Sequence, residues 1–216
     1  MGTRLLIGLG NPGPEYDWTP HNLGFHVLEY LARREGLLFE PATSLEDFDG
    51  PRAFRCARSF DPDALLVEPE TWMNRSGDVV LPLLRWCDPH ADEPLDMMVV
   101  YDDLDLELGR LRIRPHGGTG GHKGMESIVS RLGTDRFPRL RVGIGKPGTD
   151  AARHVLTRLT GESLTCAERA VAEAADAAGD WLLHGDVDRC MTRFHSRWNQ
   201  GPGDRATRTQ PKEDEE

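Results

Sequence analysis

The chain has 216 residues, of which 38% are apolar and 29% are charged, proportions typical of a folded globular protein with one substantial core. Its unbroken apolar runs are only a handful of residues long, so we expect neither a membrane span nor a signal peptide, and we expect a cytoplasmic protein. The net charge of −10 argues at first against a nucleic-acid partner.

The cysteines are widely spaced and include no C-x-x-C pair; they are Cys56, Cys87, Cys166 and Cys190. This spacing indicates neither a zinc ribbon nor a disulfide framework, and it favours small buried side chains in a reducing compartment. The histidines show no H-E-x-x-H or similar spacing either. We therefore expect no metal and no other cofactor.

The first half of the chain predicts a buried strand at 4–9, followed by a helix. The helix is expected from Thr19, a suitable N-cap, because Pro20 fits the first helical position, where a missing N–H costs nothing. Apolar residues recur at helical spacing as far as Gly36, which can end the helix. Two strands joined by an Asp-Pro-Asp turn and a proline-containing helix are then predicted at 54–59, 64–67 and 74–86.

The second half predicts three more strands, at 96–101, 110–114 and 140–145. The glycine-rich loop HGGTGGHKG leads to a helix that runs to about Leu132. Thr165 and Glu168 have the spacing of a capping box, for a helix that ends before Gly185. A shorter helix is expected to follow, to about Asn199.

Alternating strands and helices predict a single-domain α/β sandwich. We expect a mostly parallel twisted sheet with helices on both faces and some antiparallel pairing near 110–114. This domain should cover residues 1–199. The remaining segment, 200–216, is polar, rich in proline and glycine and acidic at its end, and we predict that it is a disordered tail.

The segment GLGNPG matches G-x-G-x-x-G directly after the first strand, a pattern typical of dinucleotide-binding loops. Such a site needs a helix that begins within the glycine motif and turns its first amides toward the pyrophosphate. Here Pro12 and Pro14 move the helix start well beyond the motif. We therefore favour a strand-end loop that holds Asn11, followed by a helix whose first turn presents His21.

Six motifs occur along the chain in this order: GLGNPGPEY, HNLGF, ETWMNRSG, VVYDDLDL, GGTGGHKG and RLRVGIGKPG. Together they resemble bacterial-type peptidyl-tRNA hydrolases, and the resemblance runs from about Arg4 to Trp198. It implies an enzyme that hydrolyses the ester between a peptide, or an N-blocked amino acid, and tRNA. The implied partner is peptidyl-tRNA, and we expect a monomer with no obligate protein partner and no membrane association.

Ester cleavage at neutral pH needs an activated water and a group that stabilises the oxyanion. The sequence has no G-x-S-x-G motif and no cysteine in a triad context, which argues against a covalent acyl-enzyme. His21 is the expected general base, and the resemblance pairs it with Asp102, which would fix its tautomer. The neighbouring Asp103 and Asp105 are expected to face solvent or nearby backbone.

The resemblance places a group of polar and apolar residues in the substrate cleft: Asn11, Asn22, Met73 and Asn74. The amides of Asn11 and Asn74 can donate to a developing oxyanion, and we expect both to be catalytic, although Asn74 also fits a helix N-cap. Met73 is either a wall of the cleft or a core residue. Tyr16 either stacks on the terminal base or holds a loop, and His122 contacts the loop or the substrate.

Basic residues concentrate between Gly109 and Lys146, where nine of them stand against two acidic ones. This window therefore carries a net charge of +7, and the rest of the chain −17. Arg112, Arg114 and Arg141 match family positions implicated in holding tRNA phosphate, and such contacts bind without sequence preference. The alternative is a set of solvated strand and helix faces.

Lys123 departs from the family pattern, which commonly has asparagine after the histidine of the glycine-rich loop. We expect it at the substrate site, where it either reaches a phosphate or disfavours the protonated form of His21. Two rival functions stay open: a non-enzymatic RNA-binding relative of the same fold and a nucleotide-dependent oxidoreductase. The first is opposed by the combination of His21, Asp102 and Asn74, and the second by Pro12.

Overall fold

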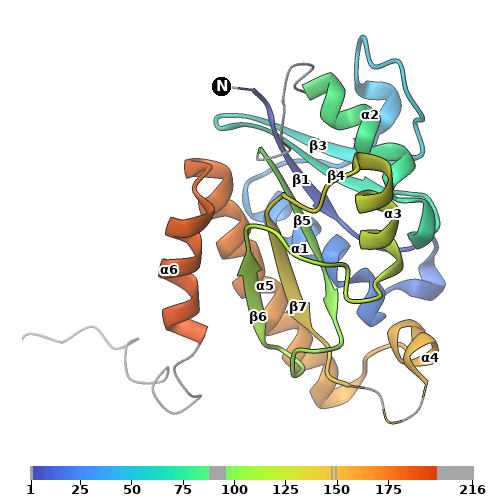
Figure 1. Ribbon diagram of the computed structural model, residues 1–216, viewed down its shortest axis with the longest axis vertical. Coiled ribbons are helices and arrows are strands. Elements are labelled where there is room, and N and C mark those ends of the chain that lie inside the picture. The colour runs from blue at the N-terminus through green and yellow to red at the C-terminus, as the bar shows by residue number, and fades with distance from the viewer. Residues whose placement is uncertain (1, 88–95, 147, 149, 199–216) are drawn as a thin grey trace, which may run out of the picture.

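A computed structural model describes residues 2–87, 96–146, 148 and 150–198, so the predicted tail at 200–216 lies outside the described residues. A seven-stranded sheet runs through the molecule in the order β2-β3-β4-β1-β5-β7-β6 (Figure 1). The strands are β1 (Arg4–Gly8), β2 (Glu40–Pro41), β3 (Phe54–Phe60), β4 (Asp63–Pro69), β5 (Met97–Asp103), β6 (Leu111–Arg114) and β7 (Arg139–Gly143).

The four central strands, β4, β1, β5 and β7, are parallel to one another. Antiparallel pairing occurs on both sides of them, where β3 joins β4, β2 joins β3, and β6 joins β7. The predicted α/β class is confirmed, including the antiparallel pairing at 110–114. The sheet therefore brings the carboxyl ends of four neighbouring parallel strands to one edge, where ligand sites of open α/β sheets form.

Helices cover both faces of the sheet (Figure 1). One face carries α1 (Leu23–Arg34), α5 (Gly161–His184) and α6 (Val187–Trp198), and the other carries α2 (Gly77–Cys87) and α3 (Lys123–Leu132). Successive strand residues point to opposite faces of the sheet. Leu6 therefore packs in the core beneath α1, α5 and α6, while Leu5 and Ile7 pack in the core beneath α2 and α3. No described helix is long and apolar enough to cross a membrane.

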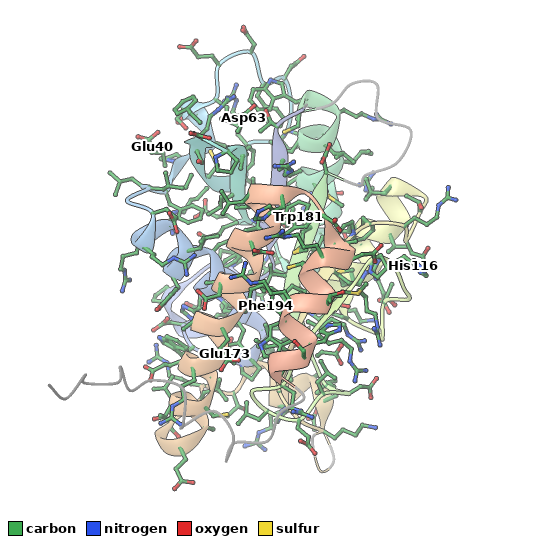
Figure 2. The ribbon with its side chains drawn as sticks, turned by 90° about the vertical axis from the view of Figure 1, so that its left-hand side faces the viewer. Glu40, Asp63, His116, Glu173, Trp181 and Phe194 are labelled. Atoms are coloured by element: carbon green, nitrogen blue, oxygen red, sulfur yellow. The ribbon has the colours of Figure 1, made fainter. Side chains whose placement is uncertain are left out.

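Helix α5 packs its alanine-rich side against the sheet and α1. The small buried residues are Ala167, Ala170, Ala174, Ala175, Ala177 and Ala178. Trp181 on α5 and Phe194 on α6 belong to the same core, and Figure 2 looks directly onto these two helices. The helix ends as predicted, with Gly185 in the left-handed conformation at φ 68°.

The start of α5 differs from the prediction. The helix begins at Gly161, one turn before Thr165, and Ser163 Oγ accepts a hydrogen bond from Thr160 N at 3.2 Å. The Thr165 hydroxyl instead donates back to Gly161 O at 3.3 Å. The predicted capping box of Thr165 and Glu168 is therefore wrong, because the helix has already begun at Gly161. The true box is formed by Thr160 and Ser163, and it differs from the usual pattern because serine replaces glutamate or glutamine at the third helical position.

Helices α1 and α2 are each preceded by a short 3₁₀ turn. Pro20–Asn22 forms one turn before α1, and Met73–Arg75 forms another before α2, so the helix predicted at 74–86 is divided near Ser76. Strand β2 and helix α4 (Ala151–Leu156) were not predicted, because neither is long enough to show a periodic pattern.

The edge strand β6 is covered by α6 rather than left open. His195 Nε2 accepts a hydrogen bond from Ile113 N at 3.0 Å, and Arg110 Nη1 donates to Trp198 O at 2.7 Å. Burial, together with the positive charges of Arg114 and Arg112, lowers the pKa of His195. The neutral ring is thus the form that can accept the strand N–H.

The stability of the fold should therefore depend on pH through His195. A histidine pKa lowered by folding contributes stability that is present above the unfolded value of 6.5 and is lost as pH falls through the folded value. Between about pH 7.5 and about pH 5 we expect wild type to lose more unfolding free energy, in urea titrations, than His195→Gln, whose amide oxygen accepts the N–H without titrating. Identical pH dependence of the two proteins would contradict this role.

Candidate active site

A cavity of about 890 Å³ opens at the carboxyl ends of β1 and β5. Nine of the predicted site residues line it: Asn11, His21, Met73, Asn74, Asp102, Arg114, His122, Lys123 and Arg141. Tyr16, Asn22 and Arg112 are not among its lining residues. The structure thus brings all four predicted catalytic residues to one cavity.

The carboxylate of Asp102 is buried at the end of β5 and binds two imidazoles. Its Oδ1 lies 2.9 Å from His21 Nδ1 and 2.9 Å from His122 Nε2. Burial by itself raises the pKa of Asp102, but the charges and hydrogen bonds of His122 and His21 outweigh it and hold this pKa far below the usual range. Asp102 is therefore a carboxylate at neutral pH.

The tautomer of His122 follows from its two hydrogen bonds. His122 is the N-cap of α3, and its Nδ1 accepts from Met125 N at 3.3 Å. Because Nδ1 accepts, the ring proton must be on Nε2, which donates it to Asp102. In this tautomer His122 donates to Asp102 and caps α3 at the same time, and a proton on Nδ1 would remove the helix cap.

The same argument assigns the proton of His21. Its Nδ1 faces the ionised Asp102 and therefore carries the proton, so Nε2 is the unprotonated nitrogen of the neutral ring. The side chain is only 11% exposed and lines the cavity. The free lone pair of Nε2 is available to accept a proton from a molecule bound there.

Glycine at position 24 makes this pairing possible. A Cβ at Gly24 would lie 2.4 Å from Leu9 N and 2.5 Å from Val100 O, so no larger residue fits. The first turn of α1 therefore contacts the backbone of β1 and β5 directly. His21 precedes this contact by three residues and Asp102 follows Val100 by two, which brings the imidazole beside the carboxylate.

Asn22 acts on the site through Asn11 rather than through the cavity. Its Oδ1 accepts from Asn11 N at 3.0 Å and its Nδ2 donates to Asn11 O at 2.9 Å. Asn11 Oδ1 in turn accepts from Met73 N at 3.0 Å, which joins the loop after β1 to the turn before α2. The Nδ2 group of Asn11 makes no hydrogen bond to a described residue, and because Asn11 lines the cavity this donor is available to a ligand.

The remaining cleft residues have different environments. Asn74 is exposed at the cavity and does not cap α2, which begins three residues later. Met73 is 5% exposed and belongs to the core as well as to the cavity wall. Tyr16 packs edge-on against Trp72, with ring centroids 6.1 Å apart, which favours its role in holding a loop.

The basic residues near the cavity are not equally available. Arg112 and Arg114 are exposed on β6, whereas Arg141 is half-buried and paired with Asp103. Burial by itself lowers the pKa of Arg141, but the Asp103 carboxylate outweighs it and raises this pKa. Asp103 does not face solvent, but the expected contact with neighbouring backbone is present, since its Oδ1 accepts from Asp105 N at 2.8 Å. The pairing with Arg141 was not expected, and it supplies the cation that a buried carboxylate needs. Lys123 is exposed and pairs with Glu126 at 3.0 Å.

Sequence reasoning missed the position of Arg139. Its guanidinium is buried, lies 4.5 Å above the Phe137 ring and donates to the backbone carbonyls of Gly117, Gly118 and Asp135. It thereby holds the glycine-rich loop that leads to His122, while His116 in the same loop is exposed (labelled in Figure 2). Arg139 alternates with Arg141 in the sequence, and nothing in the pattern separates the two.

His21, Asp102 and His122 each offer one side-chain atom that could bind a metal ion, and these three atoms lie within 4.8 Å of one another. A metal on His122 Nε2 would require the ring proton on Nδ1, but Nδ1 accepts from Met125 N. The donor set therefore fits two hydrogen bonds to a carboxylate better than it fits a metal.

The fold and the cavity define an open-sheet α/β protein with a histidine–carboxylate pair beside a ligand-sized cleft. A family model described as peptidyl-tRNA hydrolase matches residues 5–201. The chain belongs to the peptidyl-tRNA hydrolase family.

Relatives support this assignment over nearly the whole chain. A peptidyl-tRNA hydrolase from Synechococcus sp. (strain JA-3-3Ab) is 40% identical over 204 residues, which cover 94% of this chain and 87% of the relative. One from Geobacillus thermodenitrificans is 44% identical over 176 residues, covering 81% and 90%. The crystal structure of the Acinetobacter baumannii enzyme has a TM-score of 0.77 at 33% identity and covers 89% of this chain and 94% of that one.

The two tautomers can be measured by ¹⁵N–¹H correlation spectra of the imidazole groups. We expect His122 as the Nε2–H tautomer and His21 as the Nδ1–H tautomer at about pH 8, where histidines are neutral. The spectra of His21→Gln and His122→Gln assign the signals, and His26, which lies outside the cavity, serves as a reference. A His122 ring protonated on Nδ1 would contradict the shared-carboxylate arrangement.

Proposed function

We propose that this protein hydrolyses the ester bond between a peptide, or an N-blocked amino acid, and tRNA, with water activated by His21 and no covalent intermediate. The observation that carries the proposal is the buried Asp102 carboxylate, which binds His21 Nδ1 at 2.9 Å and leaves Nε2 as a base beside the cavity. The names of the relatives supply the substrate class.

In the proposed reaction, a water molecule bound at His21 Nε2 attacks the ester carbonyl carbon while its proton passes to Nε2. Asp102 stabilises the imidazolium that forms, because a fixed anion lies on the opposite ring nitrogen. The tetrahedral intermediate then collapses, the bond to the ribose oxygen breaks, and His21 returns the proton to that oxygen. The products are tRNA and the peptide acid, which releases its remaining proton to solvent and becomes a carboxylate.

Stabilisation of the oxyanion is assigned to the two asparagines. Asn11 is buried, its Oδ1 is fixed by Met73 N, and its Nδ2 is left for the substrate. A donor held in place before the reaction is worth about 3–4 kcal/mol of transition-state stabilisation. Asn74, exposed at the same cavity, supplies the second contact.

The RNA half of the substrate is assigned to the basic residues on β6 and β7. Arg112, Arg114 and Arg141 would bind phosphates without reading bases, which suits an enzyme that accepts many tRNAs. Lys123 would lie at the mouth of the cavity, with its charge partly neutralised by Glu126. We further propose a cytoplasmic monomer that needs no metal. The paired His21 and Asp102 argue against a non-enzymatic RNA-binding role.

Substitution of the base is the first test. In single-turnover cleavage of an N-blocked aminoacyl-tRNA, His21→Ala should lower the rate at least about 10²-fold with little change in binding, because general-base catalysis is lost. Asp102→Asn should also lower it, since the tautomer of His21 is no longer fixed. His184→Ala, at the end of α5, is the control and should match wild type, and EDTA should change none of these rates. Equal rates for wild type and His21→Ala would reject His21 as the base.

Salt dependence tests the RNA contacts. Arg112→Ala should raise KM and reduce the slope of log KM against log salt by about one, because one phosphate contact is lost. Arg141→Ala should do the same, although it also leaves the Asp103 carboxylate without its partner. Arg33→Ala, exposed on α1, should leave the slope unchanged. An unaltered slope in Arg112→Ala would remove this residue from the RNA interface.

A further inference from the structure

Trp72 separates two cavities. It lines the catalytic cavity and also a second cavity of about 650 Å³, which lies among the loops after β1 and β4 and the start of α2. The Trp72 side chain packs against Tyr16 but is still 55% exposed. A ligand bound at the catalytic pair can therefore continue past the indole into the second cavity.

The chemistry of the second cavity differs from that of the catalytic one. Much of its wall is apolar, formed by Pro12, Pro51, Leu81 and Pro82. Its two arginines, Arg75 and Arg131, both pair with Asp78, so neither is left for a phosphate. The exposed Glu70 adds a negative charge. These features disfavour RNA and suit an uncharged, partly apolar chain.

One polar atom in this wall lacks a partner. The Oγ1 atom of Thr71, next to Trp72, is buried and has no hydrogen bond to any described residue. A hydroxyl can both donate to a carbonyl and accept from an N–H, the two groups that a peptide backbone offers. Thr71 lines the second cavity, and its unpaired Oγ1 lies within that wall.

The strand order places the second cavity away from the arginines. The strands β4, β1, β5, β7 and β6 lie side by side in this order (Figure 1). Arg112 and Arg141 lie on β6 and β7, the catalytic pair lies at β5 and β1, and the second cavity follows at the ends of β1 and β4. A substrate whose nucleic-acid half lies on β6 and β7 therefore extends its acyl half toward β4. The second cavity lies in that direction.

We infer that the second cavity binds the peptide residues that precede the esterified one, an inference that rests on the proposed function. The volume is within the range of about 300–1,000 Å³ of ligand pockets, and proline and tryptophan walls suit an extended chain. Trp72 is then a specificity-determining residue between the reacting ester and this subsite. The subsite increases affinity for long peptidyl chains and leaves the chemistry of the ester unchanged.

The test compares two substrates on the same tRNA: an N-acetyl-aminoacyl ester, which ends before Trp72, and an N-acetyl-tetrapeptidyl ester, which extends past it. Ala53→Trp adds bulk to the wall of the second cavity at an exposed position. We expect KM for the tetrapeptidyl substrate to rise about tenfold, with kcat unchanged, and KM for the shorter substrate to stay within about twofold. Thr43→Trp, exposed on a turn that lines neither cavity, is the matched control.

Thr71→Val is a second, isosteric variant that keeps the inference testable if Ala53→Trp does not fold. It removes the unpaired hydroxyl, and we expect KM to rise about threefold for the longer substrate only. Equal effects on the two substrates, or no effect of either folded variant on the longer one, would overturn the inference. Failure of wild type to cleave either substrate would instead reject the proposed function.

Discussion

One buried carboxylate, that of Asp102, organises the site. Its Oδ1 binds two imidazoles, but the two rings differ because the second nitrogen of His122 is occupied by the N–H of Met125 and that of His21 is not. The helix cap therefore determines which histidine can accept a proton. A single hydrogen bond within the first turn of α3 thus distinguishes a positioning histidine from a candidate base, and the ionised Asp102 keeps both in the required tautomer.

The cavity depends on backbone contacts as much as on its polar side chains. Gly24 lets α1 touch β1 and β5, Asn22 fixes the loop at Asn11, and Arg139 ties the glycine-rich loop to β7. None of these three residues needs to contact substrate. They hold the segments that meet around the catalytic pair, so the geometry of the site depends on parts of the chain that are distant in sequence.

The sequence predicts most of the strands and helices and most of the residues that line the cavity, but not the short elements or the partners of the buried charges. Continuous apolar runs indicated the buried strands, and helical periods indicated the long amphipathic helices. The helix start after the glycine motif pointed to His21, and the family resemblance pointed to Asp102. The two-residue strand β2 and the six-residue helix α4 are too short for a period to show. The start of α5 was misplaced because a serine completes its capping box. The pairing of Asp103 with Arg141 depends on β5 and β7 becoming neighbours, and the contacts of Arg139 with Gly117 and Gly118 depend on the path of the loop after β6. Local sequence does not contain that information.

The free edges of the two outer strands, β2 and β6, are blocked in different ways. At one side α6 covers β6 and its His195 occupies the N–H of Ile113, while at the other β2 has only two residues and ends in Pro41, which has no N–H to offer. Unpaired strand edges are templates on which other chains add strands and aggregate. A chain that lost α6 would expose the edge of β6 as such a template, so α6 covers a strand edge as well as completing the core.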